Sequence, residues 1–114
     1  MKYMLLIHSG DGPQNYDQIP AAEQEKVMGE YMAIYQTPGV LAGGQLQPAD
    51  TATTVRVADG RTLTTDGPFV EAKEALGGYS LLEADDIDAA ITLAARIPAA
   101  RMGGAVEVRP VVER

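Results

Sequence analysis

Four apolar stretches of this chain are too short for helices and predict β-strands. Residues 3–8, "YMLLIH", run without polar alternation, which indicates a strand in the centre of a sheet, covered on both faces. Residues 40–46 and 77–84 predict two more strands, the first weakened by paired glycines. Residues 105–112 alternate around inward-facing valines and predict a last strand. Pro110 lacks a backbone N–H, so this strand is expected at a sheet edge or paired on one side only there.

A β-hairpin is the clearest local prediction. Residues 53–65, "TTVRVADGRTLTT", contain two β-rich runs separated by Asp59 and Gly60. A two-residue Asp-Gly link favours a type I′ turn, because Gly accepts the positive φ that this turn requires. Such a turn places Val57 opposite Thr62.

Two segments have the apolar spacing of amphipathic helices. The first covers about residues 21–36, and "TPG" at 37–39 ends it. The second begins near residue 86, with Asp85 or Asp86 as N-cap, and Pro98 ends it. The stripes expected to face the core are Val27, Tyr31, Ile34 and Tyr35 in the first helix, and Ile87, Ala90, Ile91, Ala94 and Ile97 in the second.

The element order is therefore β-α-β, an inserted hairpin, and β-α-β, within one domain spanning residues 1–114. This order predicts an α+β ferredoxin-like sandwich with both helices on one face of an antiparallel sheet. Two helices do not hide all the apolar strand surface, so we expect the other face to be covered by self-association as a homodimer. The strand residues expected to contribute to that surplus are Met4, Leu6, Val40, Tyr79, Leu81 and the valines of the last strand.

Charge and composition exclude several classes of function. The formal net charge is −7 and the nine basic residues are scattered, which argues against a nucleic-acid-binding surface. The apolar start is too short for a membrane span and no signal-peptide cleavage site follows it. Together with the absence of Cys, this predicts a cytoplasmic protein without disulfides or thiolate chemistry.

"DGPF" at residues 66–69 is the first candidate for a site. Asp66 follows the hairpin and could act as a general acid or base, or anchor a polar group of a ligand. The alternative is an Asx turn, in which Asp66 binds its own backbone. Phe69 is expected to fold inward as the apolar wall of a pocket, or else to fill the core or a dimer interface.

Four further residues are candidates for substrate binding. Gln45 and Tyr79 follow glycine pairs on strands expected to border the same cleft, although the glycines could instead mark a bulge and Tyr79 could be a core residue. Lys73 could neutralise an anionic ligand, or be a solvated charge beside its acidic neighbours. His8 ends the first strand and could transfer protons or be structural.

No cofactor or metal is expected from these patterns. "SGDGP" at 9–13 lacks the Gly-Lys-Ser/Thr ending of a phosphate loop, and no dinucleotide fingerprint is present. One His and no Cys leave only carboxylates as metal ligands, and Asp85, Asp86 and Asp88 fit helix capping better than an oxygen cage.

Several phrases in order resemble the YCII-related family and, within it, the DGPF-motif branch: "KYMLLI", "LAGGQLQP", "TTVRVADGRTLTTDGPF", "EAKEALGGYSLLEADD" and "GGAVEVRPV". The resemblance covers essentially the whole chain and implies a dimeric α/β barrel in which two sheets face each other. Related proteins are proposed to use a His–Asp pair, with the His on the first helix. Here the single His is His8, at the end of the first strand, so that mechanism is not carried over.

Two functions follow as hypotheses. The first is a small-molecule-binding protein or cofactor-independent enzyme, such as a lyase or isomerase, with acid–base chemistry at the "DGPF" turn. The second is a non-catalytic interaction module, because the DGPF branch is associated in bacteria with partner sigma factors of the extracytoplasmic-function type. A third interpretation assigns the turn a purely structural role in shaping the barrel.

Overall fold

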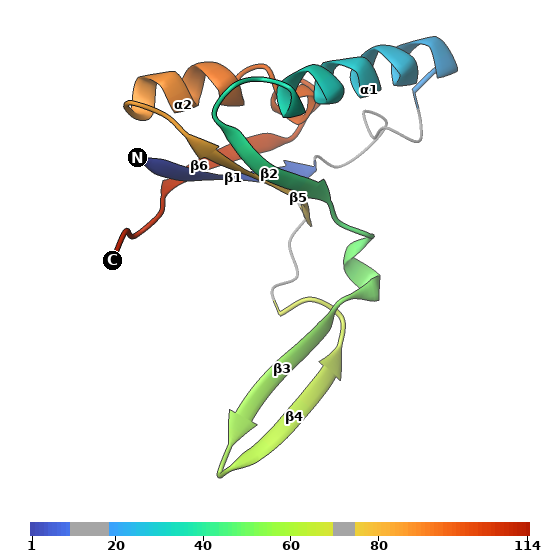
Figure 1. The fold of residues 1–114 in the computed structure, drawn as a ribbon. Helices are drawn as coiled ribbons and strands as arrows, with labels where there is room; N and C mark the ends of the chain where they lie inside the picture. Colours follow the sequence, from blue (N-terminus) through green and yellow to red (C-terminus); the bar gives the residue numbers. More distant parts are fainter. Residues whose placement is uncertain (10–18, 70–74) are drawn as a thin grey trace.

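The protein has a layer of two helices on one face of a four-stranded sheet, and a separate two-stranded sheet that extends from the other side (Figure 1). The computed structural model describes residues 1–9, 19–69 and 75–114. All strand pairs in both sheets are antiparallel. The prediction of a mixed α+β fold with two helices is therefore confirmed.

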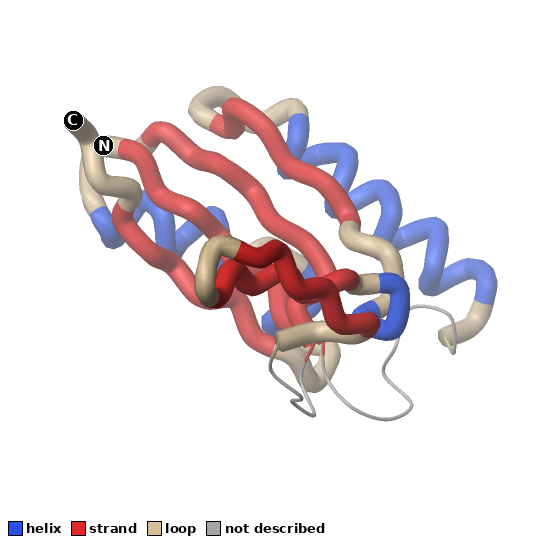
Figure 2. Tube along the Cα trace, turned by 90° about the horizontal axis from the view of Figure 1, so that it is seen from below, coloured by secondary structure: helices blue, strands red, loops and turns tan. Residues whose placement is uncertain are grey.

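The larger sheet has the strand order β2-β5-β1-β6. Its strands are β1 (Lys2–Ser9), β2 (Val40–Gln45), β5 (Ala75–Glu83) and β6 (Ala105–Pro110). The first strand is central and the last lies at the edge, as the apolar run and Pro110 predicted. One expectation differs: helices cover only one face of β1, and no helix or strand of the described residues packs on its other face (Figure 2).

Helix α1 (Ala21–Tyr35) has the predicted position, and helix α2 (Ile87–Ala94) begins where predicted but ends before Pro98. Short 3₁₀ turns lie at Ala49–Thr51 and Pro98–Ala100. Asp86 caps α2, because its Oδ1 accepts a hydrogen bond of 2.9 Å from the backbone N–H of Ala89. Neither helix in the described ranges is long and apolar enough to cross a membrane.

The core lies between the helices and β1, β5 and β6, but α2 is rotated from the predicted stripe. Leu93 is buried together with Ala90, Ala94 and Ile97, whereas Ile87 is 42% exposed and Ile91 51% exposed. The predicted and observed stripes share three residues, so apolar spacing alone does not distinguish them. Packing decides in favour of the stripe that contains Leu93.

Val40 also differs from its expected place. It packs against the core on the helix side instead of contributing to the uncovered face. The pairing of β2 with β5 shifts between Val40 and Ala42, which indicates a β-bulge at Leu41. One extra residue changes which side chains face each side of a strand, and local alternation cannot reveal this.

The hairpin consists of β3 (Thr53–Ala58) and β4 (Arg61–Asp66), and we call it the arm. Asp59 and Gly60 have φ of 51° and 73°, the two positive values that a type I′ turn requires. Val57 pairs with Thr62, as predicted. The arm points away from the helices and makes the chain less compact: its radius of gyration is 15.9 Å, against about 13 Å for a compact domain of this length.

Two glycine substitutions are expected to change stability in opposite directions. A Cβ at Gly43 would lie 2.7 Å from Tyr35 Cε1 and 3.1 Å from the backbone oxygen of Tyr79, so Gly43→Ala should destabilise by about 1–3 kcal/mol. Gly29 lies on α1 with open space around it, so Gly29→Ala should stabilise by about 0.5–1 kcal/mol. Urea denaturation measures the free energy of unfolding of both variants. Equal changes in the two variants would contradict the packing of β2 against Tyr35.

Candidate functional site

The uncovered side of the larger sheet carries both apolar and ionisable side chains. Side chains alternate along a strand, and Tyr3, Leu5 and Ile7 of β1 are buried on the helix side. The register of β1 with β5 then places Met4, Leu6, Tyr79 and Leu81 together on the other side, which we call the open face. Figure 2 looks onto this side, with both helices behind the sheet.

A group of three ionisable residues lies along one edge of the open face. His8 Nε2 is 3.6 Å from Glu107 Oε1, and the second carboxylate oxygen of Glu107 accepts a hydrogen bond from Arg109 Nη2. Pairing of β1 with β6 places Glu107 beside Leu6 and Arg109 beside Met4, so the group shares a face with the apolar residues. We call it the His8–Glu107–Arg109 cluster.

The electrostatics of the cluster keep Glu107 ionised. The hydrogen bond from Arg109 holds the pKa of Glu107 below its ordinary value of 4.5. Burial opposes this with a smaller effect than that hydrogen bond, and the charges of Arg109 and His8 lower the pKa further. A distance of 3.6 Å is too long for a hydrogen bond to His8. The carboxylate is close enough to attract the imidazole when the ring is protonated.

Tyr79 lies across the neighbouring strand of the open face. A Cβ at Gly44 would be 3.3 Å from Tyr79 Cε1 and 3.4 Å from its hydroxyl oxygen, so the ring occupies the space that the missing side chain leaves. Tyr79 is still 37% exposed. The glycine therefore makes room for a side chain of the same protein, and Tyr79 shares the open face with His8.

Gln45 does not join this group. It pairs with Gly78, and the alternation of β5 places Gly78 on the same side as the buried Ser80 and Leu82. Gln45 is exposed beyond the end of the core, on the side of the sheet opposite Tyr79. The bulge in β2 explains the difference from the expected cleft.

Asp66 ends β4 at the base of the arm, and its side chain is exposed. The turn that follows is fixed by Gly67, whose N–H donates to Ala52 O at 2.7 Å and whose carbonyl accepts from Thr54 Oγ1 at 2.8 Å. Gly67 has φ of 100°, which explains why Gly follows Asp66. These bonds hold the "DGP" turn against the start of β3.

Phe69 does not fold inward: it is 68% exposed. The guanidinium carbon of Arg56 lies 4.7 Å from its ring centroid, a cation–π contact. Arg56 pairs with Leu63 and Asp66 with Thr53, so Arg56 and Asp66 are on opposite faces of the arm. Among the described residues, Asp66 and Phe69 do not form the expected pocket wall, because the arm carries the turn away from the core.

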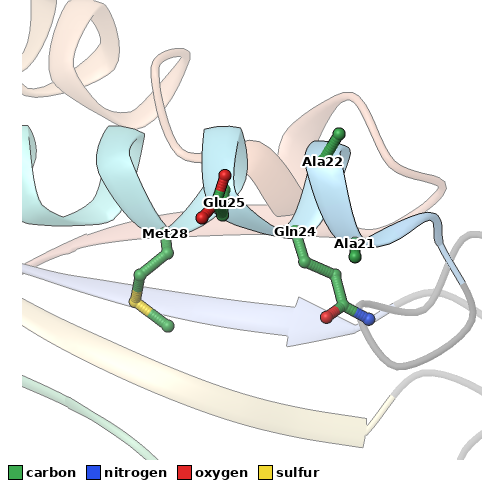
Figure 3. A pocket seen from close by; sticks show the side chains of 5 residues that line it. All are labelled: Ala21, Ala22, Gln24, Glu25 and Met28. Carbon is green, nitrogen blue, oxygen red and sulfur yellow. The ribbon is translucent and has the colours of Figure 1, made fainter.

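Lys73 lies outside the described residues, and so do Glu71 and Glu74. Elsewhere in the described part, the surface has one hollow beside the start of α1, where Gln24 and Met28 point toward the sheet (Figure 3), and another between α2 and the end of β5. Neither hollow is lined by a predicted site residue. The described residues contain no group of three His, Asp or Glu that could hold a metal ion.

The sequence prediction missed Glu107 and Arg109. A signal was present, because residues two apart on a strand share a face and both have charged side chains. The prediction for the last strand rests on its valines and Pro110, and nothing local connects Glu107 with His8. That contact depends on the pairing of the first and last strands.

Arg109→Gln is expected to raise the pKa of Glu107 toward its ordinary value, because it removes the hydrogen bond that lowers it. Stabilisation by the ionised Glu107 is present above about pH 4.5 and is lost as the pH falls through the lowered pKa, so Arg109→Gln should weaken this dependence. Carboxyl ¹³C NMR titration measures the pKa. Arg114→Gln, in the C-terminal tail, is the control, and an unchanged pKa in Arg109→Gln would contradict the assigned contact.

Comparison with known proteins agrees with the resemblance noted in the sequence. An uncharacterized protein of Rhizobium meliloti (strain 1021) is 36% identical over 94 residues, which cover 78% of this chain and 76% of that protein. The profile of the YCII-related domain matches residues 1–114. This chain therefore belongs to the YCII-related family.

Proposed function

We propose that this protein binds a small molecule on its open face and performs acid–base chemistry there without a cofactor. One observation carries the proposal: the His8–Glu107–Arg109 cluster and Tyr79 lie on the same face as the apolar side chains of Met4 and Leu6. Ligand sites combine an apolar surface with a few oriented polar groups. Imidazole and phenol groups can exchange protons with a bound molecule, and the ionised Glu107 places a negative charge beside His8.

The proposed reaction class is isomerisation or elimination next to a carbonyl group. The His8 imidazole accepts a proton from carbon, and the electron pair of the broken C–H bond moves toward the carbonyl as an enolate. Return of the proton to another carbon completes an isomerisation, and loss of a leaving group completes an elimination. Arg109 attracts an anionic substrate, and the Tyr79 hydroxyl donates a hydrogen bond to the developing oxyanion.

Asp66 remains proposed as a second acid–base or anchoring carboxylate at the rim. It lies at the base of the arm, which leaves the sheet on the side of the open face (Figure 1). We also propose that the chain belongs to the DGPF branch, is cytoplasmic and forms a homodimer with two open faces opposed, as in a dimeric α/β barrel. Support comes from the half-exposed apolar residues of that face, which a second copy would cover.

A second candidate is a non-catalytic interaction module. The observation that favours it is the exposed arm, which offers Val55, Val57 and Leu63 to another protein. Under this function, ligand binding on the open face is absent and substitution of His8 or Asp66 leaves partner binding unchanged.

A thermal-shift screen with small mono- and dicarboxylic acids tests the first proposal. We expect at least one acid to raise the melting temperature of the wild type, and His8→Gln and Asp66→Asn to reduce that rise by more than half. Asp50→Asn is the matched control, because Asp50 is an exposed carboxylate on the 3₁₀ turn before the arm.

Two results would overturn the proposal. The first is a panel in which no acid stabilises the wild type. The second is a stabilising acid whose effect persists in both variants, which would place its site away from the open face.

A further inference from the structure

The arm has no covering partner among the described residues. Every residue of its two strands is exposed except the half-buried Thr54. Val57 is 71% exposed, Val55 59% and Leu63 49%. A two-stranded hairpin is at best marginally stable alone in water, and more apolar burial is needed to hold it. These exposed residues therefore indicate a surface that is covered when the protein functions.

The two faces of the arm differ in chemistry. Pairing of β3 with β4 places Val55 opposite Thr64 and Val57 opposite Thr62, so one face consists of β-branched side chains, with Asp66 only at its base. We call it the valine face. The other face carries both arginines of the arm, beside Leu63. The valine face is the one suited to packing against another apolar surface.

The arm also has the direction and length to reach a second copy. It leaves the sheet on the side of the open face, opposite the helices (Figures 1 and 2). Strands of six residues span about 20 Å, and two facing sheets pack about 10 Å apart. A copy that covers the open face must therefore lie alongside the arm over much of its length.

Area favours participation of the arm. Four strands of about six residues present about 400 Å² of flat sheet on the open face, and one face of the arm adds about 200 Å². A standard interface buries about 800 Å² of accessible surface on each partner. Side-chain relief raises both flat areas in proportion, so the arm enlarges the contact made by the open face by about half and brings it closer to the usual value.

The charge of the arm does not oppose a second copy as the occupant. The arm contains two Arg and two Asp and has no net charge, whereas the whole chain has a net charge of −7. Two acidic bodies repel each other, and an uncharged arm adds contact without adding to that repulsion. The acidic chain is poorly suited to an anionic membrane or a nucleic acid.

We infer that the two copies exchange arms, so that the valine face of each arm packs against the body of the other copy and borders its open face. The inference rests on the proposed homodimer. It adds that the arm of one chain lines part of the candidate site of the other chain. It also gives the "DGP" turn a role in aiming the arm across the interface.

The absence of Cys from the sequence allows a direct test with single-Cys reporters. In full-length Val57→Cys, the rate of maleimide labelling is measured over a series of protein concentrations, with analytical ultracentrifugation of the same samples. We expect the rate to fall about tenfold as dimers form, because docking covers the valine face. Leu63→Cys, on the other face of the arm, and Val112→Cys, in the exposed C-terminal tail, should change by less than about twofold.

Each other outcome is decisive. Dimers in which the Val57→Cys thiol stays as reactive as the controls would overturn arm exchange but preserve the homodimer. A chain that stays monomeric, with labelling independent of concentration, would overturn both. Protection of Val57→Cys in the monomer would show that the arm folds against its own chain. Val55→Cys, on the same face, is the second reporter if Val57→Cys does not fold.

Discussion

The alternation of side chains along β1 is the constraint on which the rest of the structure depends. Tyr3, Leu5 and Ile7 point to the helices and form the centre of the core. Met4, Leu6 and His8 must then point to the opposite face. Because β1 lies between β5 and β6, its register decides which residues of both neighbours meet there. The core and the candidate site are thus two sides of the same strand.

The open face and the arm are two surfaces that the described residues leave exposed to solvent. Both helices pack on one side of the sheet (Figure 1), and among the described residues no element covers Met4 and Leu6 on the other side. The hairpin is inserted between β2 and β5 and emerges on that same side. Gly67 hydrogen-bonds to Ala52 and Thr54, so the two ends of the hairpin are held together at its base, within the "DGPF" motif. In the proposed dimer, the motif would contribute to assembly as well as to chemistry.

Local patterns predicted the strands, both helices, a cap at Asp85 or Asp86 and the turn at Asp59 and Gly60, because each depends on residues near one another in sequence. The site was predicted less completely. His8 and Tyr79 share a face because β1 and β5 are paired, and Glu107 joins them from the other end of the chain. The prediction for Gln45 did not foresee the bulge in β2, and the prediction for Phe69 did not foresee that the arm carries it away from the core.

The sequence by itself determined the mixed α+β class, the order of the elements and the tight turn of the hairpin. Apolar periodicity and turn chemistry act over a few residues and are readable without coordinates. Only the tertiary structure decided which side of α2 is buried, on which face Gln45 lies, and that Glu107 meets His8. These depend on register and on contacts between distant segments, where a shift of one residue reverses the side to which a strand residue points.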